Sequence, residues 1–242
     1  MTPWAYRQRA LVIALIYAAS FFFGYLVQGY AVNDVTPTYV LLGQYVGGSG
    51  TIAMAFLAAA FVAATYLIRL WASSYHVPGV VMKHDVVTDR LTIAGPYRFV
   101  RNPLYVGNVL LSVGIGLLGP PVTTVLIFLG NLVFVNWLCA VEEQFMATTH
   151  GEIYRQYCAE VPRLLPHLWP IRQSSNAPAP SFELGFRTEI AFLGMTLAML
   201  YFAIVAVPLD RQSYVAWIMI AIVGVFLLWQ YLANRSSKGA TR

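Results

Sequence analysis

Residues 104–141 form a stretch of 38 residues that carries no charge and is mostly apolar. Because a membrane-spanning helix needs roughly 20 apolar residues, this stretch is more than long enough for one span. Gly119-Pro120-Pro121 interrupts it, and proline both removes a backbone donor and clashes with the preceding helical turn. We therefore predict a tight helical hairpin in the membrane, whose first arm, residues 104–118, reaches only about 22 Å and is short or tilted.

Four further segments have the length and apolar character of a membrane span: residues 10–32, 48–70, 190–209 and 212–234. Only 10% of the residues are charged, whereas a soluble protein typically carries about 25%, so lipid is the natural solvent for this chain. Together with the two arms of the hairpin, these segments predict an all-α, polytopic membrane protein with about six transmembrane helices.

Almost all basic residues fall on one side of this arrangement. If both ends of each helical pair face the same side, 14 of the 15 Lys and Arg residues share it, and only Arg211 does not. Because Lys and Arg concentrate in cytoplasmic loops, we expect an integral, multi-pass membrane protein with both termini in the cytoplasm. In a bacterium, the membrane would be the plasma (inner) membrane.

The chain divides into three parts. Residues 1–83 hold the N-terminal transmembrane helices, and residues 84–172 hold the hairpin, an interfacial segment and most of the polar clusters. Residues 173–242 start with the sequence QSSNAPAP, which is typical of a flexible connection, and continue with the C-terminal helix pair. Polar sequence is scarce in this chain, so its clusters are the candidates for chemistry.

The first polar cluster is GPYRFVRNPLY at residues 95–105, just before the hairpin. Pro96 and Pro103 disfavour helix in the residues that precede them, so a rigid, non-helical approach to the hairpin is expected. Free backbone N–H groups at the start of a helix bind anionic or polar groups. Arg98 and Arg101 either hold a carboxylate or phosphate of a ligand or anchor the helix end among lipid headgroups.

The second cluster, Glu142-Glu143, follows directly after the second arm of the hairpin. Adjacent helical residues lie about 100° apart, so the two carboxylates point in different directions. A carboxylate at the membrane edge is costly unless it is paired or hydrated, which makes both residues functional candidates. An ordinary, solvated helix end is the alternative interpretation.

The third cluster covers residues 150–157 and 161–166. Gly151 favours a break in the helix, and the tyrosines and arginines of this cluster are typical of a segment that lies in the membrane interface. The four histidines of the chain are scattered and its two cysteines form no ligand cluster, so no metal site is predicted.

In this order, the three clusters resemble the isoprenylcysteine carboxyl methyltransferase family and its relatives, the phospholipid methyltransferases. The resemblance covers residues 84–170 and rests on GPYRFVRNPLYVG at residues 95–107, on EE at Glu142-Glu143, and on HGEIYRQYCAEVPRLLP at residues 150–166. It implies a membrane methyltransferase that uses S-adenosyl-L-methionine at a cytoplasmic cofactor site. The methyl acceptor would be a lipophilic substrate, either a prenylcysteine-like carboxylate or a lipid amine or hydroxyl, and nucleic acid is not expected as a partner.

The resemblance also implies roles for individual residues. Catalytic roles fall to Glu142, Glu143 and Arg163, and substrate binding falls to Arg98 and Arg163. Cofactor binding falls to Gly95, Tyr97, Arg101, Asn102, Pro103, Leu104, Tyr105, Gly116, Leu117 and Glu142.

Three positions depart from the family pattern. Asn102 stands where the family usually has histidine, His150 replaces a phenylalanine, and Leu138 replaces an arginine that the eukaryotic prenylcysteine enzymes use towards substrate. Asparagine can hydrogen bond but cannot act as a base near neutral pH. Two alternatives stay open beside the methyltransferase: a non-catalytic membrane scaffold or lipid-binding protein with the same fold, and an NADPH-dependent sterol-type reductase.

Overall fold

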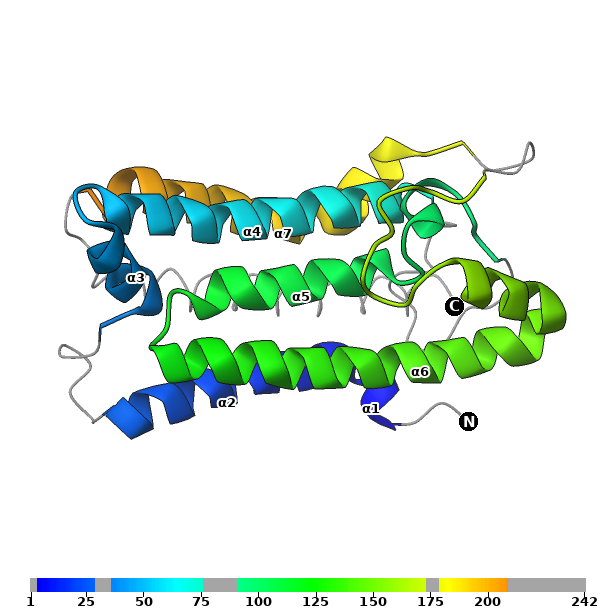
Figure 1. The fold of residues 1–242 in the computed structure, drawn as a ribbon, viewed down its shortest axis with the longest axis horizontal. Helices are drawn as coiled ribbons and strands as arrows, with labels where there is room; N and C mark the ends of the chain where they lie inside the picture. The colour runs from blue at the N-terminus through cyan, green and yellow to red at the C-terminus, as the bar shows by residue number, and fades with distance from the viewer. Residues whose placement is uncertain (1–3, 29–35, 76–90, 173–178, 209–242) are drawn as a thin grey trace, which may run out of the picture.

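The computed structural model describes residues 4–28, 36–75, 91–172 and 179–208 (Figure 1), and within these ranges all regular structure is helical. The elements are α1 (Trp4–Arg7), α2 (Arg9–Gln28), α3 (Thr38–Val46), α4 (Gly50–Ser73), the 3-10 turn η1 (Gly95–Arg98), α5 (Pro103–Gly116), α6 (Pro121–Glu160), α7 (Phe182–Tyr201) and the π-helical turn η2 (Phe202–Ala206). The all-α fold class is thereby confirmed for the part of the chain that the structure describes.

Four helices in these ranges are long and apolar enough to cross a membrane: Arg9–Val27, Gly50–Ser73, Pro121–Glu160 and Phe182–Ala206. α5 is apolar but shorter, in agreement with the short first arm expected for the hairpin. The hairpin itself is confirmed, because α5 and α6 follow each other across a short turn and pack side by side (Figure 1). The predicted span at residues 212–234 lies outside the described residues, so the total of about six spans stays a prediction.

The second arm of the hairpin does not end at Val141, where the sequence places the end of the apolar stretch. α6 continues to Glu160 because residues 142–150 include good helix formers such as Glu, Gln, Met and Ala. The regular geometry breaks instead at Gly151, whose φ of 54° is a left-handed conformation that favours glycine. The expected break at Gly151 is therefore confirmed, and it turns the last part of α6 back towards the bundle (Figure 1).

Two other helix boundaries differ from the prediction. α7 begins at Phe182 rather than at residue 190, because Glu183 and Arg187 form an i,i+4 ion pair of 2.7 Å that supports helix beyond the apolar segment. The uncharged stretch before residue 48 forms a separate short helix, α3, and a turn at Gly47 and Gly48, both with positive φ, joins it to α4.

α3 covers the turn between α5 and α6. The N–H and the hydroxyl of Thr38 both donate to the Gly119 carbonyl, at 2.8 and 2.9 Å, and the Tyr39 N–H donates to the Leu117 carbonyl at 3.0 Å. Inside a membrane no water is present to donate to these carbonyls, so the protein must supply the hydrogen-bond donors. α3 therefore fixes the position of the hairpin tip.

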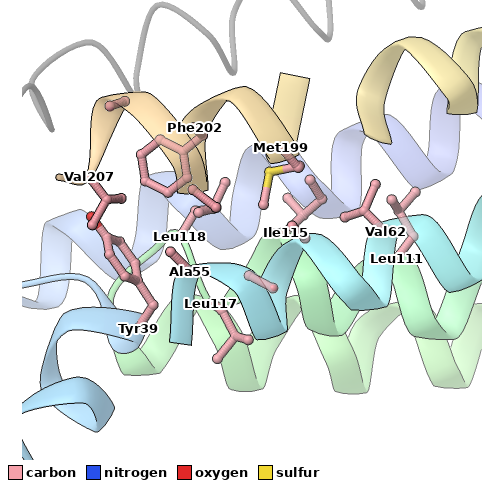
Figure 2. Close-up of a cluster of buried hydrophobic side chains, with 14 of the residues drawn as sticks. Tyr39, Ala55, Val62, Leu111, Ile115, Leu117, Leu118, Met199, Phe202 and Val207 are labelled. Carbon is pink, nitrogen blue, oxygen red and sulfur yellow. The ribbon is translucent and has the colours of Figure 1, made fainter. Parts of the chain in front are cut away.

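The largest buried apolar cluster joins α3, α4, α5 and α7 (Figure 2). The rings of Tyr39 and Phe202 meet edge to face in it, with their centroids 5.6 Å apart. Small residues let the helices approach closely, since a Cβ on Gly114 would lie 2.8 Å from the Ala58 carbonyl oxygen. Further members of the cluster are Ala55, Val62, Leu111, Ile115, Leu117, Leu118 and Met199.

Every Arg and Glu of the described residues lies towards one end of the bundle, which we call the charged end. It consists of α1, the start of α2, the last turns of α4, the start of α5, the second half of α6, the start of α7 and the segments between them (Figure 1). At the other end, α3 and the hairpin tip carry no charged residue within the described ranges. This distribution agrees with the one-sided pattern of the basic residues, and the assignment of this end to the cytoplasm stays a prediction.

Gly114→Ala is expected to destabilise the protein, because the new Cβ would lie 2.8 Å from both the Ala58 carbonyl oxygen and a Val62 methyl group. Overpacking of this kind typically costs about 1–3 kcal/mol. Gly194→Ala is the matched control, since nothing lies within 4 Å of a Cβ at that position and alanine favours helix over glycine by roughly 1 kcal/mol. Thermal unfolding in detergent measures both variants, and equal midpoints would contradict the close contact between α4 and α5.

Candidate functional site

Two segments outside the α-helices pair at the charged end: residues 95–102 before α5, which begin with the 3-10 turn η1, and residues 161–172 after α6. Three backbone hydrogen bonds of 2.8–3.1 Å join them, from Arg101 to Pro162, from His167 to Phe99 and from Ile171 to Arg98. Gly95 starts the first segment with a φ of 54°, and a Cβ there would overlap the ring of Tyr75. These contacts bring the first and third polar clusters of the sequence against each other.

Two tyrosines hold the carboxylate of Glu142. The hydroxyl of Tyr6 in α1 donates to its Oε1 at 2.6 Å, and the hydroxyl of Tyr105 in α5 donates to the same oxygen at 2.8 Å. Tyr6 and Tyr105 are both buried, and they belong to one apolar cluster with Leu138 and Cys139. Glu142 is thus held by phenols from two other helices rather than by a guanidinium.

Glu143 is held by two arginines. Arg163 binds it through two nitrogens, with Nε 3.0 Å from Oε1 and Nη2 2.6 Å from Oε2, and Arg101 lies 3.3 Å away. The hydrogen bond to Glu143 raises the pKa of Arg163 above its ordinary value, so that its guanidinium stays charged. Two cations therefore share one anion, and this group keeps a net positive charge.

Arg101 and Asn102 connect this group to the start of α5. Arg101 Nη1 donates to the Cys158 carbonyl at 3.3 Å, whereas its Nε is buried and has no hydrogen-bond partner. Asn102 precedes the first helical residue, but its side chain does not cap the helix. It donates instead to the Arg163 carbonyl at 3.2 Å, so the asparagine that replaces the family histidine makes a structural contact that needs no base.

Tyr97 and Arg98 lie in the same paired segments. The Tyr157 hydroxyl donates to the Tyr97 carbonyl at 2.7 Å, and Arg98 Nε donates to the Ile171 carbonyl at 2.7 Å. Burial raises the pKa of Tyr97, and nearby Tyr157, Glu142 and Glu189 raise it further. Its phenol therefore stays protonated, and the role of Arg98 towards substrate stays a prediction.

The remaining predicted residues divide between the two ends of α5. Pro103, Leu104 and Tyr105 form its first turn, where a proline loses no helical hydrogen bond. Gly116 and Leu117 lie at the other end of α5, about 16 Å farther along the helix than Tyr105. There Gly116 packs against α6 and Leu117 belongs to the apolar core (Figure 2). The structure therefore does not bring these two residues together with the glutamates.

The region that holds these contacts also matches the model of a known protein family. The phospholipid methyltransferase family model matches residues 52–153, which run from α4 past Gly151 in α6. This match confirms the family resemblance. Glu142, Glu143 and residues 95–105 lie inside the matched segment, whereas Tyr6 and Arg163 lie outside it. None of the curated proteins or solved structures compared with the chain matches it.

Sequence reasoning missed Tyr6, which supplies one of the two hydroxyls at Glu142. The residue lies in α1, far before the segment that the phospholipid methyltransferase family model covers. No motif spacing connects it with Glu142, because the two residues are 136 positions apart. The only signal is a tyrosine beside basic residues before the first span, a pattern common at membrane interfaces.

A buried ion pair between α4 and α7 was missed as well. Arg69 Nε lies 2.7 Å from Glu189 Oε2, and Arg69 Nη2 lies 3.2 Å from Glu189 Oε1. Glu189 is 0% exposed and also accepts a hydrogen bond of 2.6 Å from Ser73. From sequence, Arg69 was only one of many basic residues on one side, and Glu189 preceded a predicted span. The signal that could have identified each residue is a charge at the edge of an apolar helix.

Glu143→Gln is expected to loosen residues 161–172, because Arg101 and Arg163 then lose the anion that both bind. The cost should be about 1–3 kcal/mol, less than for a fully buried pair, since the Arg163 side chain is 39% exposed. Hydrogen exchange of the backbone amides in this segment measures the effect.

The control for this prediction is Glu152→Gln, which breaks an exposed pair with Arg155. Such a pair contributes at most about 0.5 kcal/mol, so exchange at residues 161–172 should not change. If the two variants exchange at the same rate, Glu143 does not hold this segment in place.

Proposed function

We propose that this chain is a membrane methyltransferase that transfers a methyl group from S-adenosyl-L-methionine to a lipophilic acceptor at the cytoplasmic face. The family match supports the reaction class. The observation that carries the proposal is Glu142, whose carboxylate two tyrosine hydroxyls hold in place within the family-matched part of α6. A carboxylate held in this way is suited to bind a cation.

The residues present fit this cofactor. S-adenosyl-L-methionine carries an ammonium, a carboxylate and a positively charged sulfur, so its site needs both an acceptor for cations and a donor for an anion. Glu142 supplies the first, and the buried Nε of Arg101, which has no partner, supplies the second. When bound, the cofactor provides a methyl group that is already activated by the positive sulfur.

Tyr6 and Tyr105 set both the orientation and the charge of Glu142. Because a phenol donates a hydrogen bond without carrying a positive charge, Tyr6 and Tyr105 hold the carboxylate without forming an ion pair with it. A guanidinium in their place would neutralise it. The two tyrosines therefore act as positioning residues that leave the carboxylate available to the cofactor.

Glu143 and its two arginines have the opposite character. Two guanidiniums and one carboxylate give a net charge of about +1, and Arg163 is partly exposed at 39% of its side chain. Because Arg101 is assigned to the cofactor, Arg163 is the member of this group that is suited to bind an anionic part of the acceptor, such as a lipid phosphate. Methyl transfer needs mainly alignment of the reacting atoms and exclusion of water.

The acceptor is best described as a membrane lipid that presents an amine or a hydroxyl. Residues 161–172 expose Leu165, Leu168 and Trp169 to 83%, 90% and 82%, and such side chains are suited to contact lipid at the membrane interface. Leu138, where the prenylcysteine enzymes have arginine, is completely buried in the cluster beside Cys139. That position therefore provides no cation for a prenylcysteine carboxylate.

Wild-type protein in detergent is expected to bind S-adenosyl-L-methionine in isothermal titration, and Glu142→Gln should weaken this binding. A hydrogen bond to a charged group contributes about 1.5–3 kcal/mol, which corresponds to a rise in Kd of roughly 10- to 150-fold. The matched control is Glu152→Gln, which removes an exposed glutamate from the same helix and should leave Kd unchanged. Absence of binding by the wild type would refute the proposed function.

Two further measurements separate the alternatives and identify the acceptor. Titration with NADPH tests the reductase, and a scaffold should bind neither NADPH nor S-adenosyl-L-methionine. Incubation of membranes with methyl-labelled cofactor, followed by lipid analysis, shows which lipid class takes up the label. Label on a prenylated protein rather than on a lipid would contradict the proposed acceptor.

A further inference from the structure

The buried pair of Arg69 and Glu189 reaches the first turns of α5. While two nitrogens of Arg69 bind Glu189, its third, Nη1, donates to the Leu104 carbonyl at 3.4 Å and to the side-chain oxygen of Asn108 at 3.0 Å. All three nitrogens of the guanidinium are therefore engaged. These donors form one rigid plane. The position of Glu189, which binds Nε and Nη2, therefore determines where Nη1 can bind α5.

Several contacts restrict Glu189 and Arg69 to this arrangement. α7 departs from helical geometry at Glu189, with φ of −105° and ψ of 16°, and the carboxylate accepts a further hydrogen bond from Ser73. The guanidinium of Arg69 lies over the ring of Phe192, 4.1 Å from its centroid. With Glu189 fully buried, this set of contacts leaves the pair little freedom to move.

The part of α5 that Arg69 holds is the part that contacts the proposed site. Leu104 immediately precedes Tyr105, whose hydroxyl holds Glu142. The α5 backbone is also held one turn farther on, where the Thr65 hydroxyl of α4 donates to the Gly107 carbonyl at 3.0 Å. A shift of this turn would move the Tyr105 hydroxyl away from the carboxylate.

We propose that Glu189 is a positioning residue for methyl transfer: it fixes Arg69, and Arg69 fixes the first turn of α5, so that Tyr105 can hold Glu142. This inference rests on the proposed function of Glu142. Glu189 lies outside the segment that the phospholipid methyltransferase family model matches. α7 is therefore part of the machinery that shapes the site and does more than surround it.

The first test is Glu189→Gln, which keeps the size of the side chain and removes the charge that Arg69 pairs with. A displacement of about 1 Å at a site of this kind can cost roughly 100-fold in rate, so kcat/KM for methyl transfer should fall by about that factor. The matched control is Glu183→Gln on the same helix, which breaks the exposed pair with Arg187. It should leave kcat/KM unchanged, and equal activity of the two variants overturns the proposal.

The second test separates positioning from folding. The double variant Arg69→Met with Glu189→Met leaves no unpaired buried charge, and replacing a buried ion pair by apolar side chains of similar size is often neutral for stability. The midpoint of thermal unfolding should therefore stay near that of the wild type. The hydrogen bonds to Leu104 and Asn108 are still missing, so kcat/KM should stay about 100-fold low. Recovery of wild-type activity would show that the pair serves folding alone.

The third test needs no activity. Cys139 is fully buried in one cluster with Tyr105, and Cys158 is the only other cysteine of the chain. In a Cys158→Ser background, Glu189→Gln should raise the rate at which a thiol reagent labels Cys139 by about ten-fold, because α5 opens locally. A Thr123→Cys variant without the two native cysteines reports on the other end of α6, where Thr123 is buried, and its labelling should not change.

The labelling result stands apart from the proposed function. An unchanged rate at Cys139, or an equal increase at Cys139 and at Thr123→Cys, overturns the role of Glu189 as a positioning residue. If the wild type binds no S-adenosyl-L-methionine, the proposed function fails instead, and the labelling rates still decide whether Glu189 holds the start of α5.

Discussion

Three carboxylates at the charged end, one buried and two partly buried, constrain how the helices can pack. A carboxylate without partners is costly in apolar surroundings, and the fold supplies each of three glutamates with partners from other elements. Glu142 receives two phenols, Glu143 two guanidiniums, and Glu189 one guanidinium and a serine hydroxyl. These partners come from α1, α4, α5 and the segments that flank α5 and α6. The glutamates can therefore find their partners only when the helices are packed in this arrangement.

The three glutamates differ in the net charge of the group that each forms with its partners. This difference indicates what each group can do. The partners of Glu142 are neutral hydroxyls, which add no positive charge to the carboxylate. The group around Glu143 is positive, since two arginines share one carboxylate. The pair of Glu189 and Arg69 is neutral and buried. A negative and a positive group that follow each other in α6 suit a ligand with both charges, whereas the neutral pair suits a structural task.

The sequence predicted helix boundaries correctly where a single residue, proline or glycine, restricts or changes the local backbone conformation. Gly119-Pro120-Pro121 predicted the hairpin, and Gly151 predicted the break in α6, because proline and glycine change the allowed backbone conformations wherever they occur. The C-terminal end of α6 and the start of α7 did not follow. The end of an apolar stretch indicates where the membrane ends. A helix does not have to end there, because it continues through residues such as Glu, Gln and Ala until the backbone geometry changes.

From the amino-acid sequence alone, we could predict an all-α membrane protein with a hairpin and identify residues 95–105 and Glu142-Glu143 as its chemical candidates. Composition, the length of apolar segments and the order of motifs are properties of the linear sequence, so they can be used without a tertiary structure. The tertiary structure was needed to show that Tyr6 completes the contacts of Glu142, that Arg69 pairs with Glu189, and that Gly116 lies far from both. Such partners depend on how each helix is rotated and packed against the next, which residues distant in sequence determine together.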